Sequence, residues 1–534
     1  MPLTPKYPGV YVQETPSRTH AISGATTADT AFVGVFEQGP ANRPAKITNF
    51  GQFTSTFGPL NPSSKATYGI SQFFQNGGRV AWVVRIRGEN DNDSAGSTAH
   101  VSLEAIGPGT WGDQIQIATQ AAADGAFDLV VRRVSDPTGT SPTVVDVETY
   151  AAVNASTTAP NYVGDAIAHR SLLVKMAAEQ PSPAAAGNVA PVAASILDPA
   201  VIGDVASPAF EQGQFSGGQD DLTVSGADAL GSHGNPSNGV LATGMYTLDS
   251  IAPEMFNILC IPAMAAFDRG QWNLAYTAAS NYCAQMGAFL IVDPPTSEIS
   301  ATDEGGQVRN IQAWWSTVGE SGSSDHAATY FPRINIPDPV TGNPMETEVS
   351  GTLAGVYATT DASRGVWKAP AGRAAVLSNV LEPVVRVGDS DNATLNEFGI
   401  NCLRAFSTGT VSWGARTVDG SHLVDSPWKY INVRRLALYI EASLELGTRW
   451  AAFEPNAEPL WASLRLSVGS FMSTLYMQGA FVGSSAKDSY FVACDATTTT
   501  PFDIQEGRLN ISVGFAPLYP AEFVVITISQ MINR

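Results

Sequence analysis

The sequence predicts a multidomain protein of mixed α/β (α+β) class. At 534 residues the chain is too long for one compact core, so two to four domains are expected. Residues 30–87 and 252–360 both read as strands alternating with helices, which is typical of an α/β layer. Residues 112–250 show the period-two pattern of strands, and two amphipathic helices are predicted in the last third.

The first 28 residues are not expected to form a domain of their own. Four prolines exclude a helix, and Val10-Tyr11-Val12 is a short β-prone segment without a local partner. An exposed β-prone arm is a liability unless a sheet takes it up. Pairing within the same chain and pairing with a neighbouring chain are both open on this evidence.

Residues 30–87 are predicted to run strand, helix, strand. The strands are expected at 31–35 and 80–86, and the helix at 67–76, ending at Gly77-Gly78. This glycine pair follows a helix rather than a strand, and no Lys-Ser/Thr comes after it. It therefore does not fit a phosphate-binding loop.

Residues 112–250 are predicted to be an inserted β-rich domain. Strands are expected at 114–119 and 127–134, and one helix at 162–178. An Ala/Pro/Ser-rich tract follows at about 181–208. The run Asn90-Asp91-Asn92-Asp93 just before the domain lacks the glycine and closing glutamate of an EF-hand, so a turn is expected there.

Residues 252–360 resume the α/β pattern, with strands at 257–261 and 288–292. The second strand ends in Asp293, and parallel sheets place catalytic groups at that end of a strand. Two prolines follow, and no histidine or second acid stands at a telling spacing. A turn-forming Asp293 is therefore favoured over the alternative of an α/β hydrolytic enzyme that uses it as its acid.

The last third of the sequence predicts two amphipathic helices and a final strand. The helices are expected at 430–446 and 459–478, with Gly447 and Gly479 as their C-terminal stops. Their apolar faces carry Val433, Leu436, Ile440 and Leu444, and then Leu460, Leu464, Phe471 and Leu475. One of Arg434 and Arg435 is expected to snorkel or to pair with an acidic neighbour. Residues 523–529 are apolar on both faces, which predicts a strand buried on both sides.

Composition and motifs argue against several classes of function. The formal charge of −20 and the lack of a basic run argue against nucleic-acid binding. No signal peptide or membrane span is expected, and the four scattered cysteines indicate reduced thiols. The six histidines lack metal-ligand spacing, and no Walker A, G-x-G-x-x-G or G-x-S-x-G motif occurs. No metal, cofactor or catalytic constellation is expected, so the chain is predicted not to be an enzyme.

Short motifs at both ends of the chain carry a family resemblance. They are YPGVYV at 7–12, FFQNGG at 73–78, VWKAPAG at 366–372, WKYINVRRL at 428–436, FEPN at 453–456 and PAEF at 520–523. Each motif alone is weak, but together and in this order they resemble contractile tail sheath proteins. That family includes the sheaths of myophage tails, R-type pyocins and phage-tail-like contractile injection systems.

The resemblance implies a domain plan and a set of linking strands. The plan has an N-terminal linking arm (1–28), a middle α/β domain (29–111 and 251–364), the inserted outer domain (112–250) and an inner C-terminal α/β sheath domain (365–534). In the family, terminal strands join a sheet of neighbouring subunits. The corresponding residues here are Tyr7, Pro8, Gly9, Val10, Tyr11 and Val12, with Phe523, Val524, Val525, Ile526 and Ile528. Residues 14–27 and those before Pro520 are expected to act as hinges.

The resemblance also implies a mechanical function. Sheath subunits polymerise helically around an inner tube and contract from a metastable extended state, driving the tube through a target envelope. The implied partners are further copies of the chain, an inner tube protein, and baseplate and terminator or cap proteins, without nucleic acid or direct membrane insertion. Assembly in the bacterial cytoplasm, in a virion or phage-tail-like particle, would follow. The closest alternative is another structural phage-tail, baseplate or surface-array protein.

Overall fold

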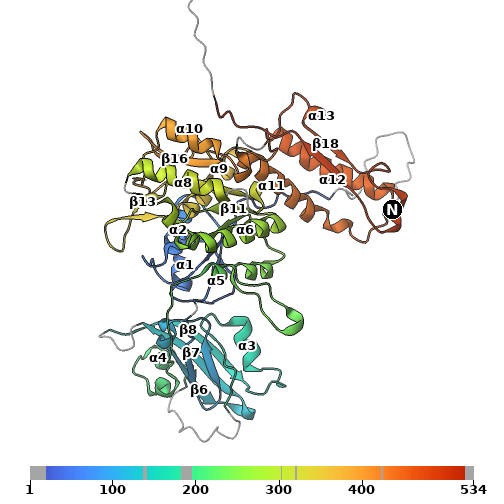
Figure 1. The fold of residues 1–534 in the computed structure, drawn as a ribbon. Helices are drawn as coiled ribbons and strands as arrows, with labels where there is room; N and C mark the ends of the chain where they lie inside the picture. Colours follow the sequence, from blue (N-terminus) through green and yellow to red (C-terminus); the bar gives the residue numbers. More distant parts are fainter. Residues whose placement is uncertain are drawn as a thin grey trace, which may run out of the picture. The chain divides into compact units, whose positions relative to one another are not determined.

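Strands from distant parts of the sequence form one mostly parallel sheet in the computed structural model (Figure 1). The structure describes residues 20–88, 90–135, 141–181, 195–301, 303–318, 322–421 and 425–523. Within these ranges the sheet has eight strands. In spatial order they are β17 (Gly409–Ser412), β16 (Ile400–Phe406), β12 (Ala327–Phe331), β11 (Phe289–Val292), β10 (Ile258–Cys260), β1 (Thr30–Gly34), β3 (Ala81–Arg85) and β2 (Ala45–Ile47).

The middle strands of this sheet are parallel, and only β17 and β2 at its two edges are antiparallel. Parallel strands covered on both faces need apolar side chains in both directions. This explains the continuous runs TAFVG in β1 and FLIV in β11, all of whose residues are buried. The α/β class and the strands expected at 31–35, 80–86, 257–261 and 288–292 are thereby confirmed.

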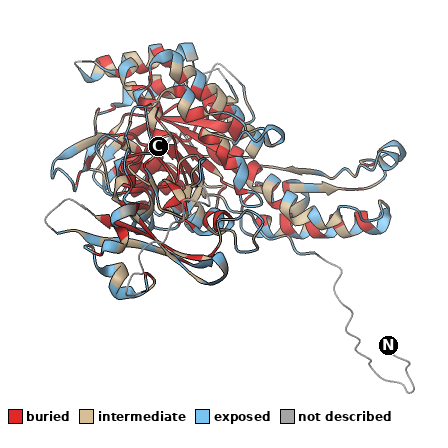
Figure 2. Cartoon of the chain, turned by 90° about the horizontal axis from the view of Figure 1, so that it is seen from below, coloured by how far each residue is buried: buried red, intermediate tan, exposed pale blue. Residues whose placement is uncertain are grey.

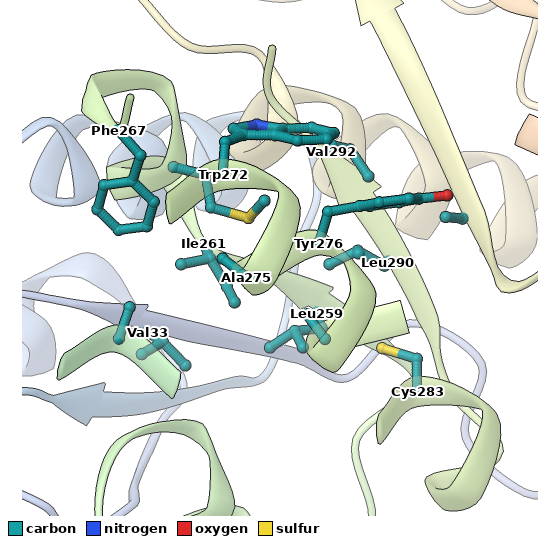
Figure 3. Packing of buried hydrophobic residues seen from close by; sticks show 14 of the residues in the cluster. Val33, Leu259, Ile261, Phe267, Trp272, Ala275, Tyr276, Cys283, Leu290 and Val292 are labelled. Carbon is teal, nitrogen blue, oxygen red and sulfur yellow. The ribbon is translucent and has the colours of Figure 1, made fainter. Parts of the chain in front are cut away.

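Helices cover both faces of the sheet. One face packs against α5 (Gly226–Leu230), α6 (Arg269–Met286), α7 (Thr296–Ile299), α8 (Glu304–Val318) and α10 (Asp389–Glu397). Figure 3 shows Trp272 and Tyr276 of α6 lying over Leu259, Leu290 and Val292 of the sheet. Buried residues fill the strands and the inward sides of the helices, and exposed residues lie on the outer turns (Figure 2).

The other face carries α2 (Lys65–Gln75) and α9 (Ser350–Arg364), with α1 (Phe50–Phe57) nearby. Phe73 of α2 packs edge-on against Phe32, with 5.4 Å between ring centroids. The two helices touch backbone to backbone, because a Cβ added to Gly351 would lie 2.2 Å from the carbonyl oxygen of Gly69. A small antiparallel sheet, β13 (Ile334–Pro337), β14 (Pro344–Thr347) and β15 (Glu382–Pro383), follows β12.

The segment predicted to be inserted contributes to two further three-stranded antiparallel sheets among the described residues, and one of them includes residues 95–105 from before its predicted start. One consists of β6 (Ile115–Ala121), β7 (Phe127–Ser135) and β8 (Thr143–Val153), and the other of β4 (Ala95–Ser97), β5 (Ser102–Ala105) and β9 (Val174–Met176). The strands expected at 114–119 and 127–134 are confirmed as β6 and β7. The short helix α4 (Pro199–Gly203) lies further along the chain, after β9. The last part of the segment predicted to be inserted, with α5, instead packs against the large sheet, so the predicted bounds 112 and 250 are both wrong.

The single long helix expected at 162–178 is wrong. The helix α3 spans only Val163–Arg170, and the chain then turns into the strand β9. The Oγ atom of Ser171 accepts the backbone N–H groups of Leu173 and Val174, at 3.2 and 2.9 Å. This local hydrogen bonding ends the helix, and pairing with β5 holds the following residues extended.

Arg132 fixes the segment that follows α3 and β9 onto the β6–β8 sheet. It is fully buried, and its guanidinium donates to the carbonyl oxygens of Ile202 and Asp204, at 2.7 and 2.9 Å, while lying 3.6 Å from the ring centroid of Phe210. We expect Arg132→Met to lower the local stability of residues 196–213 by roughly 2–3 kcal/mol, because buried carbonyls lose a charged donor. Faster amide hydrogen exchange there would show the loss. Arg170→Met, which removes an exposed guanidinium over Tyr150, is the control and should leave exchange unchanged.

The chain forms two compact units. Unit 1 consists of residues 1–27, 361–369 and 430–534, and unit 2 of residues 28–360 and 370–429. The described part of unit 1 contains α11 (Ile431–Thr448), α12 (Glu458–Met477), α13 (Ala486–Ser489), α14 (Pro501–Gln505), β18 (Tyr490–Ala493) and β19 (Ser512–Phe515). The long helices α11 and α12 pack against each other through Leu436, Ile440, Val468 and Phe471 (Figure 1).

Two expectations for the last third need correction. Residues 370–429 belong to unit 2 rather than to a domain beginning at 365, because β16 pairs with β12 and extends the large sheet. Gly447 does not end the first helix, which continues to Thr448. Its missing side chain instead makes room for Ile22, since a Cβ at Gly447 would lie 2.6 Å from the Cγ2 atom of Ile22. The second helix ends as expected, with Gly479 at a φ of 80° just beyond α12.

Candidate functional site

Residues 20–27 lie along α11 in the opposite direction to the helix. The ring of His20 stacks on Trp450 at 3.9 Å between centroids, and Ile22 packs over Gly447. Further along, the N–H of Ala25 donates to the Oγ atom of Ser443 at 2.9 Å. These residues were expected to belong to a hinge that begins at about residue 14. The structure instead places this part of the segment against the helix.

Arg435 ties this N-terminal segment to a second part of unit 1. Its guanidinium forms a two-pronged ion pair with Asp361, at 3.0 and 2.7 Å, and also donates to the carbonyl oxygen of Thr27 at 2.8 Å. The two charged side chains are only 3% and 5% exposed. The expectation that one of the paired arginines binds an acidic neighbour is confirmed, although the neighbour lies 74 positions away in the sequence.

The segment leading to the C-terminus is anchored at the other end of the same helix. The side-chain amide of Asn432 donates to the carbonyl oxygens of Trp367 and Leu518, at 2.9 and 2.8 Å. The hydroxyl of Tyr430 donates to the carboxylate of Glu522 at 3.2 Å. Thus α11 holds the base of both terminal segments of the chain.

Next to these anchors, β18 and β19 form a two-stranded antiparallel sheet. Its inner face, with Tyr490, Val492, Val513 and Phe515, packs against the cluster that contains α11 and α12. In the described part of the chain, no third strand pairs with either outer edge. A two-stranded sheet is marginal by itself, and open edges present unpaired N–H and C=O groups to any strand that can reach them.

The residues predicted as linking strands are only partly within the described ranges. Phe523 is described, and its side chain is 71% exposed. The others, Tyr7, Pro8, Gly9, Val10, Tyr11, Val12, Val524, Val525, Ile526 and Ile528, lie outside the described residues. In the sequence, the first group ends eight residues before His20, and the second group begins with Phe523, directly after Glu522.

The predicted helix-face residues lie where α11 and α12 bury their apolar sides. Buried members are Val433, Leu436, Ile440, Leu460, Leu464, Phe471 and Leu475. Leu444 is partly buried against the same cluster. The polar residues that fix the terminal segments, Asn432, Arg435 and Ser443, were not singled out as site residues. These polar residues are buried on a helix with many apolar residues, and a polar residue at such a position needs a specific partner. Polar residues within the predicted apolar helix are therefore the sequence feature that indicates them.

Asp293 neither forms a turn nor faces a cavity. Its carboxylate is buried at the start of α9, where its Oδ1 atom accepts the N–H groups of Val349 and Ser350, at 3.0 and 3.1 Å. Burial, and then the nearby carboxylate of Glu348, raise its pKa to about 7. The expectation of a turn-forming residue is therefore wrong, since the side chain caps a helix that is remote in sequence.

Open parallel sheets usually bind ligands at the carboxyl ends of the strands, between two neighbouring strands where the strand order reverses. In this chain that position, the switch point, is occupied by protein side chains. At the switch point between β1 and β10, the turn Pro262–Ala266 follows β10, and Pro262 and Met264 are buried beside α2. A cavity of about 230 Å³ lies elsewhere in unit 2, beside Trp111 and Arg133, but Arg133 is already paired with Asp146 at 2.7 Å. Within the described ranges, no group of three or more His, Cys, Asp or Glu side chains could hold a metal ion. Nor does any helix there combine the length and the apolar character needed to cross a membrane.

Comparisons with known proteins match the part of the chain that contains α11, α12, β18 and β19. Residues 424–531 match the family model described as the phage tail sheath C-terminal domain. The tail sheath protein of Vibrio phage KVP40 is 23% identical over 323 residues, 57% of this chain and 46% of that protein. This chain is therefore similar to tail sheath proteins. The tail sheath protein of Enterobacteria phage T4 is 24% identical over 181 residues, 33% of this chain and 26% of that protein. This chain thus matches about half or less of the length of these two relatives.

Solved structures from contractile particles share the fold of this chain. A chain from the cryo-EM structure of the anti-feeding prophage helical sheath in its contracted state gives a TM-score of 0.56 at 22% identity, covering 99% of this chain and 100% of that one. The contracted sheath complex of the extracellular contractile injection system PVC gives 0.54 at 21% identity, covering 99% of each. A chain from the anti-feeding prophage baseplate gives 0.55 at 22%, covering 99% and 100%.

Proposed function

We propose that this chain is a structural subunit of a contractile sheath. Copies polymerise helically around an inner tube, and baseplate and terminator or cap proteins bound the polymer. The proposal is supported by the match of residues 424–531 to the phage tail sheath C-terminal domain. It is also supported by the anchoring of both terminal segments on one helix, beside a sheet whose outer edges have no partner strand among the described residues. The open sheet β18–β19 is the observation that carries it.

Strand addition is the proposed bond between subunits. Residues 7–12 of one copy and residues 523–528 of another add to the free edges of β18–β19 in a third. Main-chain hydrogen bonds then link the copies, and alternating side chains fix the register. An arm on one surface that fits an edge on a different surface makes a heterologous contact, which repeats into an open helix rather than a closed dimer.

Both terminal segments are anchored on α11 at the ends nearest the folded unit. This arrangement suits a lattice whose subunits stay connected while its length changes. Contraction is proposed to be a rigid-body rotation of subunits from a metastable extended lattice to a shorter, wider one. Because the described anchor residues hold positions 20–27 and 518–522 on α11, the hinges would lie beyond them, closer to the linking strands. A gain of even about 1 kcal/mol per subunit, the size of a few contacts, would sum to a large driving force along a sheath.

The same proposal covers the remaining features of the chain. The two three-stranded sheets β6–β7–β8 and β4–β5–β9 form a domain on the outside of the sheath, and the subunit acts without catalysis or a cofactor. Its synthesis and assembly take place in the bacterial cytoplasm, in a particle that is a phage tail or related to one. An acidic chain with a formal charge of −20 has no part in binding nucleic acid.

Deletion of residues 1–15 is expected to abolish polymerisation while leaving the fold intact. The deletion removes a proposed linking strand but spares the contacts of residues 20–27 with α11. Negative-stain microscopy should show hollow striated cylinders for the full chain and only dispersed particles for the deletion variant. Val10→Pro, which removes one main-chain donor from the strand, should weaken assembly in the same direction.

Circular dichroism and tryptophan fluorescence of the deletion variant serve as the folding control and should match those of the full chain. Cylinders that persist without residues 1–15 would contradict the linking role. Flat arrays in place of cylinders would instead identify a surface-array protein.

A further inference from the structure

The turn between α11 and α12 presents a fully exposed aromatic side chain. Phe453 lies there, just beyond the short helix Arg449–Ala451, and its relative exposure is 108%. Its backbone φ is +68°, in the left-handed region that bulky side chains rarely adopt. Of the four residues other than glycine with positive φ in the described ranges, two are asparagines and one is alanine.

The turn is held in place on both sides of Phe453. The side-chain amide of Asn456 donates to the carbonyl oxygen of Arg508 at 2.8 Å, and its Oδ1 atom accepts the indole N–H of Trp461 at 2.8 Å. Close by, α14 presents Phe502, which is 62% exposed. Phe453 is therefore a positioned apolar group at one end of unit 1.

Two unfavourable features coincide at Phe453, and contacts within the described chain offset neither. A large apolar side chain remains in water, and a residue without a preference for positive φ is kept there. Glycine or asparagine would fit the same turn without strain. Residues held in strained backbone conformations cluster at functional contacts, and aromatic side chains are enriched among the anchors of protein interfaces.

We propose that Phe453 is a docking residue that inserts into an apolar cleft on a second copy of this chain. This inference rests on the proposed function. His20, the first described residue, stacks on Trp450, three residues before Phe453. Val12 precedes His20 by eight residues, and an extended chain covers at most about 3.5 Å per residue. A neighbouring copy that pairs with residues 7–12 therefore lies within roughly 28 Å of His20, which is itself next to this turn.

Phe453→Asn and Phe453→Gly test this inference because they separate assembly from folding. Both replacements relieve the positive-φ strain, so the melting temperature of the unassembled subunit should stay the same or rise. Loss of a buried interface aromatic should raise the critical concentration for polymerisation by roughly tenfold or more. Leu274→Asn, at a 56% exposed position in unit 2, is the control and should leave the critical concentration unchanged.

A photo-cross-linking residue at position 453 identifies the partner directly. Cross-linked dimers of this chain are expected in assembled material. Cross-links to a different protein only, or an unchanged critical concentration for Phe453→Asn, would overturn the docking role while leaving the sheath function in place. An equal loss of assembly in Leu274→Asn would also overturn it. A full chain that never polymerises would overturn both.

Discussion

Arg435→Met is expected to lower the free energy of unfolding of unit 1 by roughly 3–5 kcal/mol. The substitution removes the guanidinium but leaves the Asp361 carboxylate buried, and an unpaired buried charge is strongly destabilising. It also removes the hydrogen bond to the carbonyl oxygen of Thr27. Residues 20–27 should therefore exchange their amide hydrogens faster than in the wild-type chain, together with those of α11.

Two comparisons make this prediction specific. Arg449→Met removes a guanidinium whose ion pair with Glu445 is exposed, and it should lower the stability by less than about 1 kcal/mol. Adding Asp361→Leu to Arg435→Met should recover most of the loss, because the uncompensated charge is then gone. Equal effects of Arg435→Met and Arg449→Met would contradict a structural role for the buried pair.

Asp293 should make unit 2 less stable as the pH rises from about 4 to about 7. Its pKa is raised to about 7 in the folded chain, chiefly by burial, whereas an unfolded aspartate titrates near 3.9. Below about pH 4 both states hold the proton, so the full stability is present. Between the two pKa values only the folded state keeps the proton, and ionisation progressively removes roughly 4 kcal/mol.

Asp293→Asn isolates this contribution. The amide oxygen can still accept the N–H groups of Val349 and Ser350, but the side chain no longer titrates. Denaturant unfolding at several pH values should therefore give a difference between variant and wild type that grows from pH 4 to pH 7 in favour of the asparagine. Glu348, whose pKa is also raised by burial, interacts with Asp293, so the same comparison in a Glu348→Gln background removes its titration from the difference. A difference that does not change with pH would contradict the assignment.

Local patterns in the sequence were enough to predict the long elements. The 3.6-residue spacing of Val433, Leu436 and Ile440 predicted α11, and continuous apolar runs predicted the buried parallel strands. Helix ends were less predictable, because tertiary contacts decide them. Gly447 would end an isolated helix, but Ile22, more than 400 positions earlier, packs into the space that the glycine leaves.

The site could be predicted only as far as its parts are contiguous in the sequence. The terminal β-prone segments carry their own pattern, so they could be named as linking strands, and that assignment stays a prediction. Some contacts form only after the chain has folded, such as those between Arg435 and Asp361 and between Ala25 and Ser443. No local spacing in the sequence predicts such pairs. The inclusion of residues 400–412 in the large sheet was missed for the same reason, since strand order is a property of the whole fold.

Unit 1 is built from three stretches that are separated by long tracts of unit 2. During synthesis residues 20–27 leave the ribosome long before α11, against which they pack, so about 400 further residues emerge before this contact can form. A chain that ends before α11 could fold much of unit 2, yet it would lack the helix against which residues 20–27 pack. Residues 20–27 therefore find their binding surface only in chains whose synthesis has passed α11.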